Sequence, residues 1–439
     1  MDNVLQSNLE SAILTGLSTN FTTDLGYRLE ANYPNLSKQL VVVPPNVAPA
    51  SGAPWSTTVI FSLPRSGIMT DLFINTNFTM SATTGSAAGP VFVNDYDCGL
   101  SLFESVELRA RNRIICSNHD CYIRARVYNA PTEKALFYKR MSKIQPLNSV
   151  AAITSTATVM NVWTPIFFSF MESVREGLDL TFVENLQLYC NWNTSVRAGW
   201  GAATYSGAGN LPTAVTIADP ANVNMNLYMR YYNLTNSEWA KLKSENFRRD
   251  SPSQFLIYDN VMESPYVNLS QSANTTISIN LTVNNCVTAT HILTVFNTAG
   301  GCALIPGDCA TPGYIDAVGF KLQGKFVWQS ISTIGLDKER HKFGASDLTY
   351  GTSPSVGGNG GYIPVMLKNN SHISIFWGLD PSHSYNSGAV SLHSRNAPTL
   401  YLTQNLNPTT ATTIYIVHEV LSIMSVDGLS SAITVSTGL

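Results

Sequence analysis

The chain has 439 residues, of which 44% are hydrophobic and only 13% are charged, and its formal net charge is −3. This length predicts two or three domains with large cores, and the charge argues against a protein that wraps nucleic acid over its whole surface. No apolar run approaches the ~20 residues of a membrane helix, and the polar start Met1-Asp2-Asn3 is unlike a signal peptide. The seven cysteines lack the spacing of a disulfide framework, so we expect reduced thiols in a protein that is made in the cytosol or nucleus and is not secreted.

The start of the chain is polar and poorly periodic, and we expect residues 1–38 to form an N-terminal arm. Within the arm, the apolar residues of Asn3–Leu14 share one face of a helix, with Asp2 as its cap and Gly16 at its end. A frayed terminus is the alternative for this arm. The β-region is expected to open at Leu40.

Two stretches about half a chain apart have the same pattern. Thr57–Thr79 contains two alternating apolar segments on either side of Pro64–Gly67. Thr275–Asn297 repeats this shape at an offset in residue number of 275 − 57 = 218. Alternation of apolar and polar residues is typical of half-buried strands. The repeat therefore predicts two similar β-units in tandem.

Later segments correspond in the same order, at offsets that shrink along the chain. The offsets in residue number are 320 − 106 = 214, 364 − 165 = 199 and 414 − 225 = 189. The corresponding segments are Leu102–Ile115 and Tyr314–Ile331 (Val106 against Phe320), Thr164–Ile166 and Tyr362–Val365, and the strands at Met225 and Ile414. Such an ordered set predicts two copies of one fold, with shorter loops in the second copy.

The segments between these strands set the expected domain boundaries. Ala130–Lys143 is expected to form a short helix, and Ser195–Ala221, rich in Gly, Ala and Thr, a long surface loop. Thr235–Glu238 has the spacing of a capping box, which predicts a linker helix. The expected divisions are an arm (1–38), a first jelly roll (39–236), a linker helix (237–253), a second jelly roll (254–430) and a C-terminal tail (431–439).

The predicted fold class is all-β: two tandem eight-stranded antiparallel jelly-roll β-sandwiches, with short helices in loops. Many short strands, long connections and almost no long helices favour sandwiches, and two sheets closed over one core leave few free edges. Tandem immunoglobulin-like domains are the alternative, although about 100 residues per domain is typical of them.

Four parts of the sequence stand out together: the turn Pro64–Ile68 between the opening strands, Asp97–Ile115 (DCGLSLFESVELRARNRII), Thr164–Ser173 with Gly177–Trp192, and Ile414–Gly428 (IYIVHEVLSIMSVDG). In this order they resemble the double jelly-roll major capsid proteins of tailless icosahedral double-stranded DNA viruses. This lineage includes adenovirus-hexon-like, virophage and polinton-like proteins. The resemblance covers roughly residues 40–430 and lies in the order and texture of the strands.

The resemblance implies a structural protein of the virion, made in the host cytoplasm or nucleus, without cofactors. It implies a homotrimer in which six jelly rolls form a pseudo-hexagonal capsomer, and then a lattice of capsomers. Penton and minor capsid proteins would be further partners. The N-terminal arm would contact an internal membrane or the genome, without sequence-specific binding of nucleic acid. The low charge of the chain agrees with extensive subunit contacts, since interface cores are depleted in charged residues.

Nine basic residues lie close together in the sequence. They are Arg109, Arg111, Arg113, Arg124, Arg126, Lys134, Lys139, Arg140 and Lys143. They are candidates for an inner surface that faces genome or membrane, or for salt bridges between capsomers, which would set register more than affinity. A solvated strand face is an equally strong alternative.

Other polar clusters favour structural roles. Cys116, His119 and Cys121 lie within six residues, but a metal site needs about four ligands, so we expect a loop with buried thiols. Gly357–Gly361 lacks the Lys-Ser/Thr of a phosphate loop. His418 precedes Glu419 in an alternating strand and is expected to be structural. No HExxH, GxSxG or paired carboxylates point to catalysis, so we expect no enzyme.

Two other function classes are alternatives to a shell protein. A lectin-like tandem β-sandwich would bind carbohydrate by stacking sugars on loop aromatics, of which Trp192, Trp200 and Trp377 are candidates. A jelly-roll enzyme is disfavoured because the sequence lacks the His-rich strand cluster of a metal-binding cupin.

Overall fold

The structure is a computed structural model that describes most of the β-region. The described residues are 36–50, 56–65, 67–80, 82–84, 98–130, 134, 137–138, 141–142, 145–146, 158–171, 178–180, 183–193, 216–217, 221–234, 253–268, 275–298, 301–303, 315–332, 350–352, 364–366, 372–377, 388–404, 412–427 and 432–437. The helices expected at Asn3–Leu14 and after Thr235 lie outside these residues, as do most of the expected loop 195–221 and all of Gly357–Gly361.

The first sandwich consists of two antiparallel sheets. The larger has the order β1 (Leu36–Val43), β12 (Ala221–Leu234), β3 (Ile68–Met80), β8 (Thr158–Ile166) and β7 (Gln145–Pro146), with β9 (Leu178–Asp179) beside β3. The smaller has the order β2 (Val59–Ser62), β10 (Leu186–Trp192), β5 (Phe103–Ala110) and β6 (Arg113–His119). A small ribbon pairs β4 (Ala82–Thr84) with β11 (Thr216–Ile217).

The second sandwich has the same plan. Its larger sheet runs β13 (Ser253–Met262), β25 (Thr412–Asp427), β16 (Cys286–Thr298) and β17 (Gly301–Ala303), with β14 (Tyr266–Asn268) and β26 (Ala432–Thr437) beside β25, and β22 (His372–Phe376) and β23 (Val390–Ser391) beside β16. Its smaller sheet runs β15 (Thr276–Asn280), β24 (Thr399–Gln404), β18 (Ile315–Leu322) and β19 (Lys325–Ser332). A ribbon pairs β20 (Tyr350–Thr352) with β21 (Pro364–Met366).

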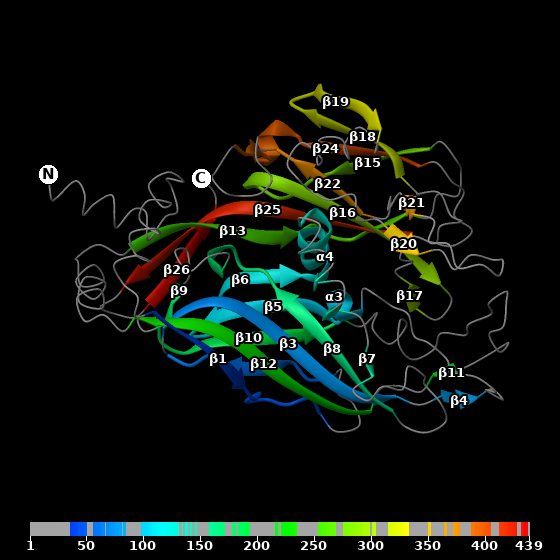
Figure 1. The fold of residues 1–439 in the computed structure, drawn as a ribbon. Helices are drawn as coiled ribbons and strands as arrows, with labels where there is room; N and C mark the ends of the chain where they lie inside the picture. The colour runs from blue at the N-terminus through cyan, green and yellow to red at the C-terminus, as the bar shows by residue number, and fades with distance from the viewer. Residues whose placement is uncertain are drawn as a thin grey trace, which may run out of the picture.

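The strand order identifies both sandwiches as jelly rolls. The main strands in chain order are β1, β2, β3, β5, β6, β8, β10 and β12 in the first half, and β13, β15, β16, β18, β19, β22, β24 and β25 in the second. Numbered one to eight, they pair as 1-8-3-6 and 2-7-4-5 in both halves (Figure 1). The predicted double jelly roll is therefore confirmed.

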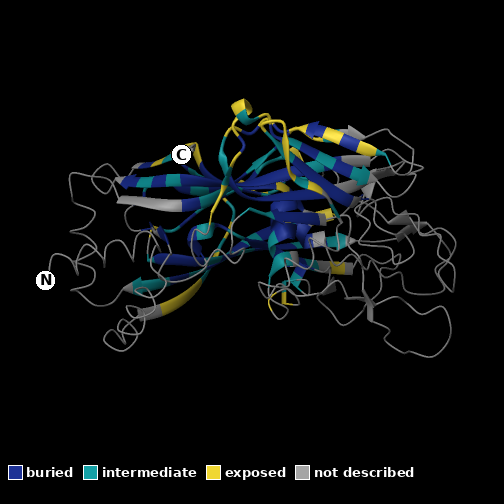
Figure 2. Ribbon diagram, turned by 90° about the horizontal axis from the view of Figure 1, so that it is seen from above, coloured by how far each residue is buried: buried dark blue, intermediate teal, exposed yellow. Residues whose placement is uncertain are grey.

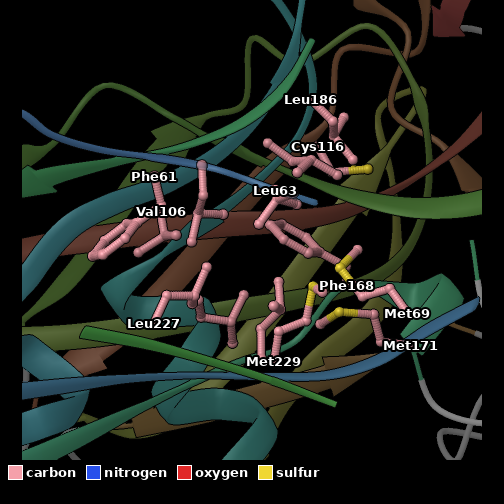
Figure 3. Close-up of a cluster of buried hydrophobic side chains, with 14 of the residues drawn as sticks. Phe61, Leu63, Met69, Val106, Cys116, Phe168, Met171, Leu186, Leu227 and Met229 are labelled. Carbon is pink, nitrogen blue, oxygen red and sulfur yellow. The ribbon is translucent and has the colours of Figure 1, made fainter. Parts of the chain in front are cut away.

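Each pair of sheets encloses a core built from the alternating strands. Val59 and Phe61 on β2 are fully buried, as are Val106 and Leu108 on β5, and the residues between them are less buried. Figure 3 shows side chains from the two sheets of the first sandwich facing one another. Burying a large apolar side chain contributes roughly 1.5–3 kcal/mol, so this alternation fixes which face of each strand points inward.

The structure corrects two of the predicted correspondences. The counterpart of β8 is β22, because β22 pairs with β16 as β8 pairs with β3; the predicted partner near Pro364 forms the separate ribbon β20–β21. Phe320 corresponds to Leu108 rather than to Val106, at an offset of 320 − 108 = 212, since Leu108 and Phe320 pair with equivalent residues of β10 and β24. An alternating pattern looks the same after a shift of two residues, which explains the error.

Two segments expected as single strands are hairpins. Within Leu102–Ile115 the chain turns at Arg111 and Asn112, whose φ angles are 48° and 65°, between β5 and β6. Within Tyr314–Ile331 it turns at Gln323 and Gly324, with φ angles of 50° and 78°. Two successive residues with positive φ are typical of the tight turn that suits the twist of paired strands.

The described helical content is small and differs from the prediction. The clear helix is α4 (Asp120–Asn129), which begins where the sequence suggested a loop. Lys134, Phe137 and Tyr138, within the expected helix 130–143, are helical. Residues Ala432–Thr437 of the expected C-terminal tail form β26. Among the described residues, no helix combines the length and hydrophobicity needed to cross a membrane.

Candidate functional site

Helix α4 lies between the two sandwiches and contacts both of them (Figures 1 and 2). Tyr122, only 3% exposed, donates a hydrogen bond from its hydroxyl to Oε2 of Glu419 at 3.3 Å, and its ring lies 6.0 Å from that of His291. Asn129 Nδ2 donates to Oγ of Ser374 at 2.9 Å. Cys121 and Tyr122 also pack in one apolar cluster with Leu293 and Val417. The helix therefore covers the outer face of the β13-β25-β16 sheet.

Two edge strands, β6 and β13, meet beside this helix. Ser117 N–H donates to Asp259 Oδ1 at 3.0 Å, and His119 N–H donates to Asn260 Oδ1 at 3.1 Å. In return, Asn260 Nδ2 donates to the carbonyl oxygen of Ser117, and Ser117 Oγ donates to that of Asn260. Among the described strands, none pairs with this edge of β6, and side chains of β13 satisfy its backbone groups instead, so the edge is covered.

The charge state of Asp259 depends on this contact. Burial raises the pKa of its carboxyl from 3.8 to about 6, although hydrogen bonds from the N–H groups of Ser117 and Asn260 oppose the rise. The carboxylate is held where its ionised form is costly.

Apolar packing continues across the same contact. Ile257, Met424, Val426 and Ile433 of the second sandwich belong to the hydrophobic cluster that forms the core of the first. All four are at most 6% exposed. The two sandwiches therefore share buried apolar surface as well as hydrogen bonds, as expected for a contact that is permanent within one chain.

His418 and Glu419 point to opposite sides of β25. His418, fully buried, has Nδ1 3.0 Å from Thr290 Oγ1 and Nε2 3.3 Å from Glu263 Oε1. Burial by itself would raise the pKa of Glu263, but the close approach of His418 and hydrogen bonds from Thr282 and Val283 outweigh it and lower that pKa to about 2. Thr288 Oγ1 donates to Glu419 Oε1 at 2.6 Å. These contacts agree with the structural role expected for His418.

Three of the candidate basic residues lie along the β5–β6 hairpin. Arg109 forms an ion pair with Glu107 and lies 4.3 Å over the ring of Tyr189. Arg111 pairs with Glu184 at 3.3 Å, and Arg113 is exposed. Exposed pairs of this kind contribute little to stability, and the side chains of Arg111 and Arg113 both lie at the surface.

The other basic candidates lie elsewhere. Arg124 and Arg126 are on α4, where Arg124 is only 2% exposed and Arg126 is half-buried, so the alternative of a solvated strand face is wrong for these two residues. Asp120 lies close enough for the charge of Arg124 to lower its pKa, although burial raises that pKa overall. Lys134 is exposed, whereas Lys139, Arg140 and Lys143 lie outside the described residues.

The two thiols of the Cys116–Cys121 segment face different clusters. Cys116, on β6, packs in the first sandwich's core, and Cys121, on α4, packs against the second sandwich. Burial raises the pKa of both thiols, and the charges of Asp259 and Asp120 raise them further. Among the described residues, no three His, Cys, Asp or Glu side chains are grouped so that they could hold a metal ion.

Two of the aromatic residues considered for carbohydrate stacking are part of cores. Trp192 is 6% exposed and donates from Nε1 to the carbonyl oxygen of Thr57 at 3.0 Å. Trp377 packs against the second core and donates from Nε1 to Thr290 Oγ1. Trp200 lies outside the described residues. Neither described ring is placed to stack on a sugar, so the lectin-like interpretation is not favoured.

Sequence reasoning missed the residues that make the contact between the sandwiches. Tyr122 lies in a helix that was not predicted, and Asp259 and Asn260 were not singled out. A signal was present: Asp259-Asn260 is an adjacent polar pair in the middle of an otherwise apolar-rich strand. Polar residues at such a position need partners, because unpaired buried polar groups are costly.

Comparisons with known proteins give the fold its relatives. No family model and no curated protein sequence matches the chain. A solved structure of the PBCV-1 virus capsid matches with a TM-score of 0.63 at 15% identity, over 92% of this chain and 97% of that chain. The Faustovirus major capsid protein matches with a TM-score of 0.60 at 11% identity, over 96% and 98%. The mavirus major capsid protein matches with a TM-score of 0.54 at 10% identity, over 91% and 90%. Similarity at such low identity concerns the fold, and the chain has the double jelly-roll fold of these viral major capsid proteins.

Proposed function

We propose that the chain is a major capsid protein that builds the shell of an icosahedral virus. The observation that carries this proposal is the pair of jelly rolls with identical strand order, joined side by side through a buried contact. The similarity to viral capsid proteins over nearly the full length of both chains supports it. A shell protein needs no catalytic residues or cofactor, and we propose neither for this chain.

The proposed assembly is a homotrimer. Two similar sandwiches per chain make three chains look six-fold, which lets one protein tile a mostly hexagonal lattice. Closed cyclic symmetry satisfies a contact between unlike surfaces without leaving an open end. The subunit interface should be of order 2,000 Å² or more, as in obligate assemblies.

Finer roles follow from this assembly. We propose residues 39–236 and 254–430 as the two jelly rolls, and residues 1–38, of which the last three belong to β1, as an arm that fastens neighbouring capsomers, a membrane or the genome at the shell's inner side. Penton and minor capsid proteins are the proposed further partners. Arg111 and Arg113, at an exposed hairpin, are the candidates for contacts with anionic groups or neighbouring capsomers. The proposed location is the virion.

Light scattering on the purified protein tests the proposal. The particle in solution should have three times the mass of the 47.8 kDa chain, and negative-stain microscopy should show pseudo-hexagonal particles. A monomer at micromolar concentration would contradict the proposal, and so would binding of a monomer to a glycan array, which would favour the lectin-like alternative. Deleting residues 1–35, which spares β1, should leave trimers intact and impair shell assembly.

A further inference from the structure

The two sandwiches correspond residue by residue through their strand registers. Residues that pair with one another across three neighbouring strands form a row in the larger sheet of each sandwich. A row of the first sandwich has a counterpart in the second, because the paired residues occupy equivalent positions. The rows are Val42–Tyr228–Phe73 and Met262–Val417–His291, with offsets in residue number of 262 − 42 = 220, 417 − 228 = 189 and 291 − 73 = 218. All six side chains lie on the outer face, away from the core of their own sandwich.

In the second sandwich, the first sandwich covers this face. Val417 is fully buried and His291 is 2% exposed, both beside Tyr122 of α4. On the edge strand β13, Asn260 is 3% exposed and holds the backbone of β6. The outer face and the edge strand therefore form one docking surface within the chain.

In the first sandwich, the equivalent face is open at its edge strand. Leu40, the counterpart of Asn260 (260 − 40 = 220), is 64% exposed, and Val42 is 47% exposed. Tyr228 and Phe73 are half-buried. Exposed large apolar side chains on an end strand are rare in monomers and are typical of interaction surfaces.

The opposite side of the contact shows the same asymmetry. Ile115 lies on β6, the strand that β13 contacts, and is 2% exposed within the cluster that forms the first sandwich's core. Its counterpart on β19 is Val327, because 327 − 115 = 212 equals the offset between Leu108 and Phe320. Val327 is 52% exposed, and β19 is an end strand of its sheet among the described residues. Each half of the intrachain contact thus has an uncovered counterpart in the other sandwich.

We propose that these two uncovered surfaces bind each other between copies of the chain. The β1 edge of one copy, with Leu40 and Val42, receives strand β19 of the next copy, with Val327. This inference rests on the proposed self-assembly and assigns its interface. The contact repeats the placement of β13 on β6, with β1 in the place of β13 and β19 in the place of β6; Leu40 takes the place of Asn260, and Val327 that of Ile115.

The contact within the chain combines hydrogen bonds with buried apolar side chains. The contact between copies must form by association, where burial of apolar surface is the main favourable contribution. Because each copy offers both surfaces, the contact joins unlike faces and closes into a ring.

Charge substitutions at the two surfaces provide the first test. Leu40→Glu and Val327→Glu, each made in the full chain, should convert the trimer into a monomer of 47.8 kDa, a threefold loss of mass by light scattering. The matched control is Ile114→Glu, at a side chain that is 47% exposed on β6, which should leave the trimer unchanged. Far-UV circular dichroism verifies that each variant is folded. Trimers of both surface variants would overturn the proposal.

Disulfide cross-linking provides a second test that leaves the fold and charge almost unchanged. Asn260 touches Ser117, and the counterpart of Asn260 is Leu40. Ser117 follows Cys116, whose counterpart is Trp328 (328 − 116 = 212), and the register of β19 shifts just beyond Trp328, so that Gln329 and Ser330 share the place of Ser117; the pair tested is Leu40 with Gln329 of another copy. The double variant Leu40→Cys/Gln329→Cys should give covalent species of two and three chains on a non-reducing gel after mild oxidation. Each single variant and the native protein should remain single chains. Dimers from a single variant would indicate a symmetric contact and refute the assignment.

The outcomes separate this inference from the proposed function. If the native protein is a monomer, the proposed capsid assembly fails. If the native protein is a trimer that resists both charge substitutions and shows no cross-link, the capsid proposal stands and the assigned interface is wrong.

Discussion

The carboxyl group of Asp259 lies where β6 meets β13, and exchanging it for an amide tests that contact. Its Oδ1 accepts hydrogen bonds from the N–H groups of Ser117 at 3.0 Å and Asn260 at 2.8 Å. The variant Asp259→Asn retains an amide oxygen that can accept both bonds but carries no charge. Because burial raises the pKa of Asp259 to about 6, ionisation at neutral pH is the costly feature of this site.

The magnitude follows from the change in pKa. An acid with a higher pKa in the folded state binds its proton more tightly there, so the free energy of unfolding falls as pH rises from 3.8 to about 6. The rise in pKa from 3.8 to about 6 limits the loss of unfolding free energy on ionisation of Asp259 to about 3 kcal/mol. The free energy of unfolding of the variant minus that of the native protein should therefore be larger at pH 7 than at pH 4, by roughly 1–3 kcal/mol. The removal of the charge should thus favour the variant at pH 7.

Urea denaturation of both proteins at pH 4, 5, 6 and 7, followed by tryptophan fluorescence, measures this difference. Glu104→Gln, at an exposed carboxylate on β5, is the matched control and should show no such trend. A stability difference between Asp259→Asn and the native protein that is the same at pH 4 and pH 7 would refute the reasoning.

Three further substitutions test other contacts. Glu263→Gln should lower the free energy of unfolding at pH 7 by about 1–3 kcal/mol. Hydrogen bonds outweigh burial and lower the pKa of Glu263 to about 2, so the stability advantage of the native protein should vanish as pH falls from 4.5 towards 2. Urea titrations at each pH measure this advantage. Tyr122→Phe should cost about 1–3 kcal/mol in thermal denaturation, because buried Glu419 loses a donor. Gly67→Ala should lower the melting temperature more than Gly324→Ala: both have positive φ, but only at Gly67 would a Cβ lie 2.7 Å from other atoms. Equal effects of the two glycine substitutions would show that crowding at Gly67 is unimportant.

The fold could be predicted from the periodicity of apolar residues, because this periodicity depends only on neighbouring residues in the chain. A strand with one face in the core must alternate, and two copies of one architecture must present their strands in the same order. The pairs β2 and β15, β3 and β16, and β12 and β25 were therefore matched correctly from sequence. The counterpart of β8 was assigned wrongly, because the segment around Pro364 has a similar pattern but pairs elsewhere, whereas β22 takes the place of β8.

Turns inside alternating segments were not predicted, for a different reason. Arg111-Asn112 and Gln323-Gly324 reverse the chain without breaking the apolar pattern, so each hairpin read as one strand. The helix α4 was missed because its residues are buried on several sides and show no amphipathic stripe. Tyr122, Ile123 and Arg124 are consecutive and all at most 3% exposed, since the helix is enclosed by both sandwiches.

The amino-acid sequence by itself determined that the chain forms two similar β-sandwiches with apolar inner faces, because alternation and its repetition are properties of the chain read in order. Only the tertiary structure decided how these sandwiches meet. Asp259 pairs with a backbone group 142 residues away, and Tyr122 with a carboxylate 297 residues away. A local pattern can mark such a side chain as needing a partner, but it does not say which distant residue that partner is. Whether Leu40 or Val327 is buried depends in the same way on which surfaces come together in space, and not on the neighbours of either residue in the chain.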